Sequence, residues 1–253
     1  MRVFFFFDET VFYHPQMLET LLRDSRHEWV GLGLSPHDRL GEYFWRNAAQ
    51  IGYLAGAKLI YRKYSALLKD KLRFSATPLT LQAVARKYNL SYSIVPEVND
   101  KTYIKYLKSL DIDVIVSSGL QIFKPPLLSL PKIACINRHS ALLPAHGGML
   151  PVFQAIAAGD RETGVSIHIM DDTIDTGPVI IQRAISIPKY PVLSDIYEEC
   201  FVMSAELILQ ALEILENSLP FQLLPDPDRQ PSYHSYPSAE DWLKFKKRNG
   251  RFA

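Results

Sequence analysis

Short apolar runs that fit buried strands alternate with helical segments along this chain, and this alternation limits the possible folds more than any other sequence feature. In the first half, strands are predicted at residues 3–7, 29–32, 92–95 and 114–117, and helices at 16–23, 79–88 and 101–110. In the second half, strands are predicted at 135–137, 165–170 and 179–187, and helices at 151–158 and 193–215. This alternation predicts an α/β fold with a mostly parallel sheet and helices on both faces.

The overall composition fits an ordinary globular protein and argues against several other classes. The chain has 253 residues, 47% of them hydrophobic and 22% charged, and its formal net charge is +1. Such a balanced charge gives no global prediction of nucleic-acid or membrane binding. With only Cys135 and Cys200 and no CxxC pair, we expect no disulfide framework and no metal, and we predict a cytoplasmic location. A membrane-spanning helix is not expected, because no window approaches about eighteen uncharged apolar residues.

Two segments depart from the strand–helix alternation. Residues 42–74 have helical spacing and carry seven basic against two acidic residues, which predicts a basic helical insertion. Its Tyr and Leu content fits peripheral contact with an anionic membrane or a polyanionic substrate, and a helical hairpin with a solvated basic face is the alternative. Residues 220–253 are rich in proline and end in a basic cluster, so we predict a catalytic domain at 1–219 followed by an extended basic tail.

Three polar residues in the second half form the strongest candidate for chemistry. Asn137 and His139 are two residues apart at the end of a predicted strand, so strand alternation sends both side chains to one side of the sheet's carboxyl edge. The amide and a protonated imidazole can stabilise an oxygen that becomes negative, as acyl transfer requires. Asp175, in a glycine-bounded loop after the next strand, is the candidate carboxylate that favours the protonated ring and aids proton transfer.

The wider motif around these residues resembles the formyltransferase family. It combines Asn137-Arg138-His139, the Leu-Leu-Pro loop that ends at Pro144, the Thr-Gly-Val-Ser strand entry at 163–166, and Asp175. The resemblance spans about residues 113–219. It implies a Rossmann-like fold, 10-formyltetrahydrofolate as the formyl donor, and Asn137, His139 and Asp175 as the catalytic set.

The resemblance also implies where the donor binds. In the family, the pterin pocket uses backbone after the strand that precedes the catalytic Asn and backbone of the loop that carries the catalytic Asp. The corresponding residues here are Gln121, Ile122, Phe123, Met170, Asp171 and Ile174. Ordinary core packing is the alternative interpretation of Ile122, Phe123 and Ile174.

The acceptor side of the motif departs from the family pattern. A serine usually stands where this chain has Ala141, and His146 and Gly147 replace the usual residues before the loop glycine, Gly148. We predict His146 and Gly148 on the acceptor side, with a surface-polar role as the alternative for His146. His168 is interpreted as an internal histidine rather than a catalytic one.

The function that these observations predict is transfer of a formyl group to a primary amine. A small acceptor is expected, because the 34 residues after 219 are too few for the C-terminal domain of methionyl-tRNA formyltransferases. A nucleotide-linked amino sugar would suit the basic insertion, and tRNA is the less favoured partner. Methionyl-tRNA formyltransferase-like activity, hydrolysis of the formyl donor and a non-catalytic folate- or nucleotide-binding module are the alternatives, and a homodimer stays open.

Overall fold

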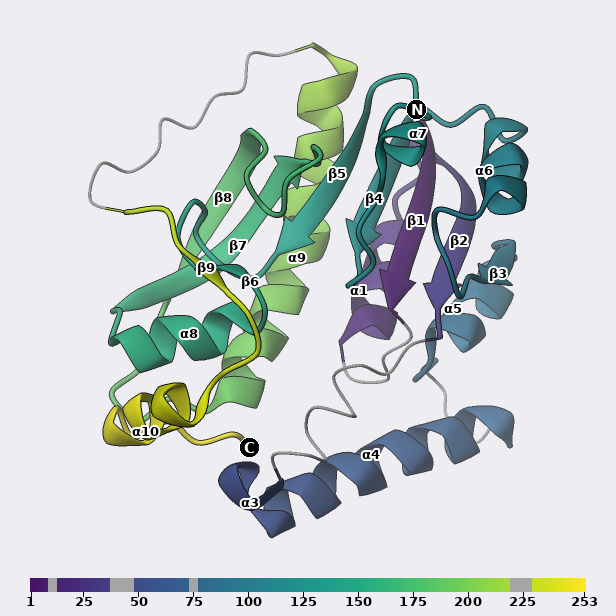
Figure 1. Cartoon of the computed structure of the whole chain (residues 1–253). Coiled ribbons are helices and arrows are strands. Elements are labelled where there is room, and N and C mark those ends of the chain that lie inside the picture. Colours follow the sequence, from purple (N-terminus) through teal and green to yellow (C-terminus); the bar gives the residue numbers. More distant parts are fainter. Residues whose placement is uncertain (9–12, 37–47, 73–76, 219–228) are drawn as a thin grey trace. The chain divides into compact units, whose positions relative to one another are not determined.

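The computed structural model describes residues 1–8, 13–36, 48–72, 77–218 and 229–253. Within these ranges the chain forms two compact units, Met1–Cys135 and Ile136–Ala253. Figure 1 labels their helices and strands. Each unit is described by itself below.

The first unit is a parallel sheet with helices on both faces. Its strands are β1 (Arg2–Asp8), β2 (Glu28–Ser35), β3 (Tyr92–Ile94) and β4 (Val114–Ser118). Its helices are α1 (His14–Leu22), α3 (Ala48–Ile51), α4 (Tyr53–Lys71), α5 (Leu81–Lys87), α6 (Lys101–Lys108) and α7 (Pro125–Leu128). Strand β1 pairs in parallel with β2 and β4, and β2 pairs in parallel with β3 (Figure 1).

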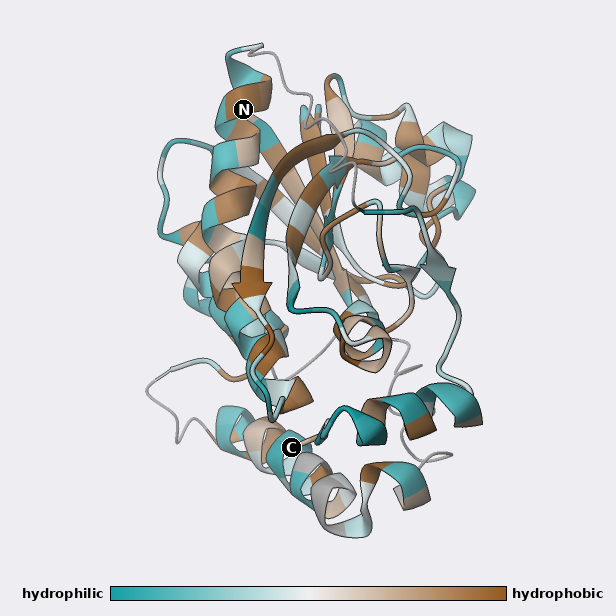
Figure 2. Cartoon of the chain, turned by 90° about the vertical axis from the view of Figure 1, so that its left-hand side faces the viewer, coloured by the Kyte–Doolittle hydropathy of each residue, from teal (hydrophilic) through white to brown (hydrophobic). Residues whose placement is uncertain are grey.

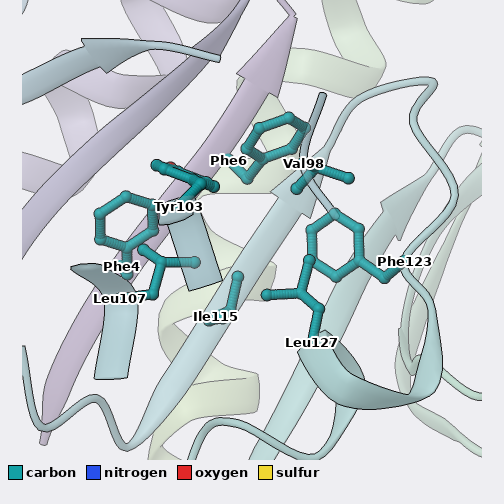
Figure 3. Close-up of a pocket in the computed structure, with 8 residues that line it drawn as sticks. All are labelled: Phe4, Phe6, Val98, Tyr103, Leu107, Ile115, Phe123 and Leu127. Atoms are coloured by element: carbon teal, nitrogen blue, oxygen red, sulfur yellow. The ribbon is translucent and has the colours of Figure 1, made fainter. Parts of the chain in front are cut away.

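Strand β1 is apolar on both faces because both faces are covered. Phe5 and Phe7 alternate with Phe4 and Phe6, and none of the four is more than 1% exposed. On one face, the Phe7 ring lies 5.3 Å from the ring of His14 in α1. On the other face, side chains from β1, β4, α6, α7 and two loops line a small apolar pocket (Figure 3): Phe4, Phe6, Val98, Tyr103, Leu107, Ile115, Phe123 and Leu127.

The second unit contains three antiparallel strands and a short parallel pair. Its strands are β5 (Ala134–His139), β6 (Gly147–Gly148), β7 (Glu162–Ile169), β8 (Val179–Ser186) and β9 (Tyr233–His234). Its helices are α8 (Pro151–Ala158), α9 (Leu193–Glu216) and α10 (Ala239–Lys247). Strand β7 lies between β5 and β8 and runs antiparallel to both, β6 pairs in parallel with β9, and α9 packs on β7 and β8. The predicted Rossmann-like α/β class is confirmed, and each predicted strand and helix is present within a few residues of its expected bounds.

The C-terminal segment is not an extended tail, which corrects the sequence-based prediction. Ser238 accepts a hydrogen bond from the Asp241 N–H, and the Asp241 carboxylate accepts one from the Ser238 N–H, so a capping box starts helix α10. Trp242 and Phe245, three residues apart, are buried against Phe153 of α8 at ring distances of 4.8 and 4.5 Å. Figure 2 shows both teal and brown along α10, as expected of an amphipathic helix. The prolines and terminal lysines of residues 220–253 had favoured an extended chain over this helix.

The insertion is helical where it is described. Helices α3 and α4 account for most of the range predicted at 42–74, while residues 42–47 and 73–74 lie outside the described residues. The expected domain boundary at 219/220 also lies outside them, so the division into 1–219 and 220–253 stays a prediction. No helix in the described part of the chain is long and apolar enough to cross a membrane.

Candidate active site

Strand β5 separates a polar face from a core face. The strand continues through His139, so Asn137 and His139 lie within it rather than just past its end, and alternation directs both side chains to one face. Arg138 between them points the other way, where its Nε donates to Ser204 Oγ at 2.7 Å and its guanidinium lies 3.8 Å from the centre of the Phe201 ring. The strand therefore presents the two candidate catalytic groups together.

Asp175 completes the predicted trio from the loop between β7 and β8. Its carboxylate, 10% exposed, accepts the Gly148 N–H at 2.8 Å on Oδ2 and the Asn137 Nδ2–H at 3.3 Å on Oδ1. The same Oδ2 lies 3.4 Å from His139 Nδ1. The three residues that the sequence singles out thus converge within the second unit, around one buried carboxylate.

His168 is also part of this cluster, which the sequence analysis did not assign to the site. Strand β7 pairs His168 opposite Asn137, and His168 Nε2 lies 3.2 Å from Asn137 Nδ2 and 3.5 Å from Asp175 Oδ1. Its Nδ1 lies 2.8 Å from the Ile169 carbonyl oxygen, so Nδ1 carries the proton and Nε2 accepts from the Asn137 amide. The signal was available, since strand alternation from the apolar Ile167 and Ile169 sends His168 to the opposite face.

The loop after β5 supplies main-chain partners to two of the catalytic candidates. The carbonyl oxygen of His146 lies 2.9 Å from His139 Nε2, which donates to it, and the Gly148 N–H binds Asp175. Both residues have positive φ, 57° at His146 and 89° at Gly148. The structure therefore brings the two predicted acceptor-side residues against the catalytic trio, through their main chains.

The His146 ring lies in a second polar group. Its Nε2 lies 2.7 Å from Asp160 Oδ2, and its Nδ1 lies 3.2 Å from Nε2 of His234, whose ring stacks on it at 5.3 Å. Asp160 follows α8 and His234 belongs to β9, and neither was predicted as a site residue from the sequence. Asp160 is about 14 positions from His146 and His234 about 88 positions, so no local spacing joins these residues.

The charges of the trio follow from burial and from these contacts. Burial opposes ionisation of Asp175, but the His139 and His168 rings and the Gly148 N–H outweigh it and hold the pKa of this carboxyl well below its ordinary 3.8. For His139, burial is the largest influence and lowers the pKa of the ring below its ordinary 6.5, although Asp175 and the His146 carbonyl act in the opposite direction. An ionised Asp175 therefore lies beside a ring whose protonation burial opposes and the neighbouring carboxylate and carbonyl favour.

The donor-binding residues predicted in the first unit have different surroundings. Gln121 is held by its own side chain, which accepts the Val98 N–H at 2.8 Å and donates to the Val95 carbonyl at 3.1 Å. Phe123 is 3% exposed and packs in the apolar pocket of Figure 3, so its side chain belongs to the core. Ile122 is 59% exposed and is the apolar side chain of this group that remains open to a ligand.

The donor-binding residues predicted in the second unit lie on the loop that carries Asp175. Met170 is half-buried at the start of this loop, and Ile174, beside Asp175, is 42% exposed. The Asp171 carboxylate accepts the Thr173 N–H at 3.0 Å and the Thr173 hydroxyl at 2.8 Å, so it organises the turn itself. No group of three or more His, Cys, Asp or Glu side chains in the described ranges is arranged to hold a metal ion.

Comparison with known proteins points to one family. The sequence matches the formyl transferase family over residues 75–212, which is more than half of the chain and includes Asn137, His139 and Asp175. A methionyl-tRNA formyltransferase from Staphylococcus aureus strain JH1 is 33% identical over 167 residues, which cover 65% of this chain and 53% of the relative. This chain therefore spans about half the length of the curated relatives that it matches.

Solved structures share the fold at low sequence identity. A glycinamide ribonucleotide transformylase from Symbiobacterium toebii superposes with a TM-score of 0.62 at 14% identity and covers 92% of this chain and 94% of its own. An N-formyltransferase from Helicobacter canadensis, solved in complex with folinic acid and dTDP-3-aminofucose, superposes with a TM-score of 0.59 at 14% identity and covers 98% of this chain and 80% of its own. At these identities the likeness establishes the fold alone.

Proposed function

This chain belongs to the formyl transferase family, and from that premise we propose that it transfers a formyl group from 10-formyltetrahydrofolate to a primary amine of a small acceptor. The observation that carries the proposal is the convergence of Asn137, His139 and Asp175 around one buried carboxylate, with distances of 3.3 and 3.4 Å from Asp175 to the other two. Binding alone does not require this combination, whereas transfer of an acyl group does.

Each member of the trio has a distinct role in the proposed reaction. The acceptor nitrogen bonds to the formyl carbon and loses one proton, the bond from this carbon to the donor nitrogen breaks, and the donor nitrogen gains one proton. The ionised Asp175 accepts the first proton through a bridging water and returns it by the same route to the donor nitrogen, and it orients His139, which acts as an imidazolium. The Asn137 amide and the imidazolium stabilise the negative oxygen of the tetrahedral intermediate.

The chain offers suitable contacts for the folate donor. Ile174 exposes an apolar side chain directly beside Asp175, and Ile122 exposes another in the first unit. Exposed backbone at 170–174 can pair with the donor and acceptor edge of a pterin, while Ile174 contacts its flat ring. We assign Gln121, Phe123 and Asp171 a supporting part, since the Gln121 and Asp171 side chains hydrogen-bond to neighbouring groups and Phe123 packs in the core.

A nucleotide-linked amino sugar is the acceptor that we favour. The acceptor loop differs from the family pattern at Ala141, His146 and Gly147, and the solved N-formyltransferase from Helicobacter canadensis was bound to dTDP-3-aminofucose, which has such a chemistry. Methionyl-tRNA is the competing acceptor, because the curated relatives at 33% identity are named methionyl-tRNA formyltransferases.

One assay separates the candidate reactions. The protein is incubated with 10-formyltetrahydrofolate, and tetrahydrofolate release is followed with a nucleotide-linked amino sugar, with glycinamide ribonucleotide, with methionyl-tRNA, and with no amine. Release that depends on the amino sugar supports the proposal, and release that depends on another amine reassigns the acceptor. Equal release without amine would identify a hydrolase, and binding of the donor without any release would identify a binding module.

Helix α4 is proposed as a peripheral membrane contact. Tyr53, Tyr61 and Leu68 are 77%, 75% and 56% exposed, and their spacing of 8 and 7 positions places them on one face of the helix. Lys58 and Lys69 flank this face. Exposed tyrosines and leucines beside lysines fit the interface of an anionic bilayer. A cytoplasmic location, supported by the free and buried Cys135 and Cys200, gives access to such a surface.

Vesicle sedimentation tests the membrane contact. The protein should sediment with phosphatidylglycerol-containing vesicles and not with pure phosphatidylcholine, and the K58E/K69E double variant should lose sedimentation. A matched charge reversal on another exposed helix, K101E/K105E on α6, should retain it. Failure of the wild type to sediment would refute the contact, and a dimer in light scattering that the α4 variant abolishes would assign this face to a second copy instead.

A further inference from the structure

Residues 232–234 of the C-terminal segment, which include strand β9, form hydrogen bonds with residues 144–149 after β5. Ser232 donates its N–H to the Pro144 carbonyl at 3.2 Å and accepts the Gly147 N–H on its own carbonyl at 2.9 Å. Its side-chain Oγ accepts the His146 N–H at 2.9 Å. The His234 carbonyl accepts the Met149 N–H at 2.8 Å. Four hydrogen bonds thus fix residues 144–149 against residues 232–234.

The same loop holds two of the three catalytic candidates from its other side. The His146 carbonyl accepts the hydrogen bond from His139 Nε2, and the Gly148 N–H donates to Asp175. The residue whose N–H binds Ser232 Oγ is therefore the residue whose carbonyl orients His139. A short chain of contacts leads from Ser232 through the His146 main chain to the catalytic ring.

The loop needs such support because its backbone is held in a costly conformation. His146 has a side chain and a φ of 57°, and a non-glycine residue in this left-handed region costs about 1–2 kcal/mol. The bond from the His146 N–H to Ser232 Oγ stabilises this conformation directly. When a buried N–H loses its acceptor, the loop relaxes toward a conformation in which water replaces that acceptor.

The His146 ring is fixed from two further elements. Asp160, after α8, lies at 2.7 Å from Nε2, and His234 of β9 lies at 3.2 Å from Nδ1. The Asp160 carboxylate accepts from Nε2–H, and the two rings share one hydrogen bond between His146 Nδ1 and His234 Nε2. Main chain and side chain of His146 are both set by partners that the C-terminal segment provides.

We propose that Ser232 and His234 are positioning residues of the active site, which set the His146 carbonyl and the Gly148 N–H and through them the orientation of His139 and Asp175. The proposal rests on the function proposed above. It makes residues 232–234 part of the machinery of formyl transfer rather than a tail attached to it. A displacement of about 1 Å in catalytic groups can lower turnover by about 100-fold, so loss of one loop bond is enough to be measured.

The test compares two variants at Ser232 with one control variant at Ser235. S232A removes the Oγ acceptor, S232T retains a hydroxyl, and S235A removes an exposed hydroxyl three residues further along the same segment. For S232A we expect a fall in kcat of about 10-fold to 100-fold with KM for the donor changed by less than about twofold. S232T should recover most of kcat, and S235A should match the wild type.

A second readout separates positioning from general stability. The ring of His139 is titrated by NMR in each variant, and thermal unfolding is recorded alongside. S232A should shift the His139 titration midpoint while remaining folded at the assay temperature, and S235A should not. An unchanged kcat and an unchanged midpoint in S232A would overturn the proposal. The proposal would also be overturned if S232A lost activity only in proportion to its unfolded fraction and S232T did not restore the activity.

The two proposals fail in distinguishable ways. If the wild type transfers no formyl group to any amine tested, the proposed function fails. The NMR titration then decides the positioning role by itself, because it reports the link from Ser232 to His139 without any turnover.

Discussion

Replacing Asp175 by Asn removes one charge and one acceptor oxygen from the centre of the site with almost no change in shape. In the wild type, Oδ2 serves the Gly148 N–H and faces His139, while Oδ1 serves the Asn137 amide and faces His168. An asparagine side chain can keep an oxygen on one of these sides only. Its NH2 group must then face either the Gly148 N–H or the Asn137 amide, both of which are donors.

The size of the effect follows from these contacts. A hydrogen bond to a buried charged group contributes about 1.5–3 kcal/mol, so losing one acceptor should lower the free energy of unfolding by about that amount. Turnover should fall further, because the imidazolium form of His139 loses its countercharge at the moment it is needed. Loss of one such electrostatic or proton-transfer element typically costs about 100-fold or more in kcat.

Amine-dependent release of tetrahydrofolate measures kcat for D175N, and urea denaturation measures its stability. D172N is the matched control, since Asp172 lies on the same loop, is exposed, and accepts no hydrogen bond that holds the site. Expected results are a loss of about 100-fold or more in kcat for D175N and none for D172N. If D175N turned over at the wild-type rate while folded, the roles assigned to the carboxylate and to His139 would both be wrong.

Three other perturbations test separate parts of the reasoning. G148A places a Cβ against the His234 carbonyl oxygen at a φ of 89°, so it should abolish activity and lower the melting temperature. The control is G56A on α4, where the added Cβ meets open space, and its melting temperature should equal or exceed that of the wild type. W242A removes a ring that is 3% exposed and lies 4.8 Å from Phe153, and urea denaturation should show a loss of about 3–5 kcal/mol; a loss below about 1 kcal/mol would mean that α10 is not docked. Burial lowers the folded-state pKa of His139, so the unfolded state binds the proton more tightly, and this residue's contribution to stability is complete above pH 6.5 and is lost as pH falls below it. As pH is lowered through this range, the melting temperature should therefore fall less steeply in H139Q than in the wild type. Equal slopes in the two proteins would contradict the direction of the pKa shift.

The sequence was sufficient for the parts of the molecule that local pattern determines. The run at residues 3–7 is apolar at every position, and a strand with both faces covered is what such a run predicts and what β1 is. Pro151 predicted the first turn of α8, and the structure begins this helix at the same residue. The shared direction of Asn137 and His139 was predicted in the same way, because they differ by two positions on one strand.

The parts that the sequence did not predict depend on contacts between distant residues. Helix α10 was missed because its capping box and its two buried rings stand among prolines and lysines that suggest an extended chain. Asp160, Ser232 and His234 lie about 14, 86 and 88 positions from His146, and no periodicity connects them to it. Such residues can be assigned to the site only from the three-dimensional structure of the loop that they contact.

Arg138 shows why one strand can carry both a reactive face and a core face. Its guanidinium is buried behind the site, over the Phe201 ring, and burial lowers the pKa of this group to about 10, so it remains charged at pH 7. A permanent positive charge next to His139 in sequence adds to the influences that lower the pKa of this ring. The pKa of the ring is thus set by opposing neighbours, since burial and Arg138 lower it while Asp175 and the His146 carbonyl raise it. A charge that packs in the core thus helps to set the protonation state of a residue on the opposite face of the strand.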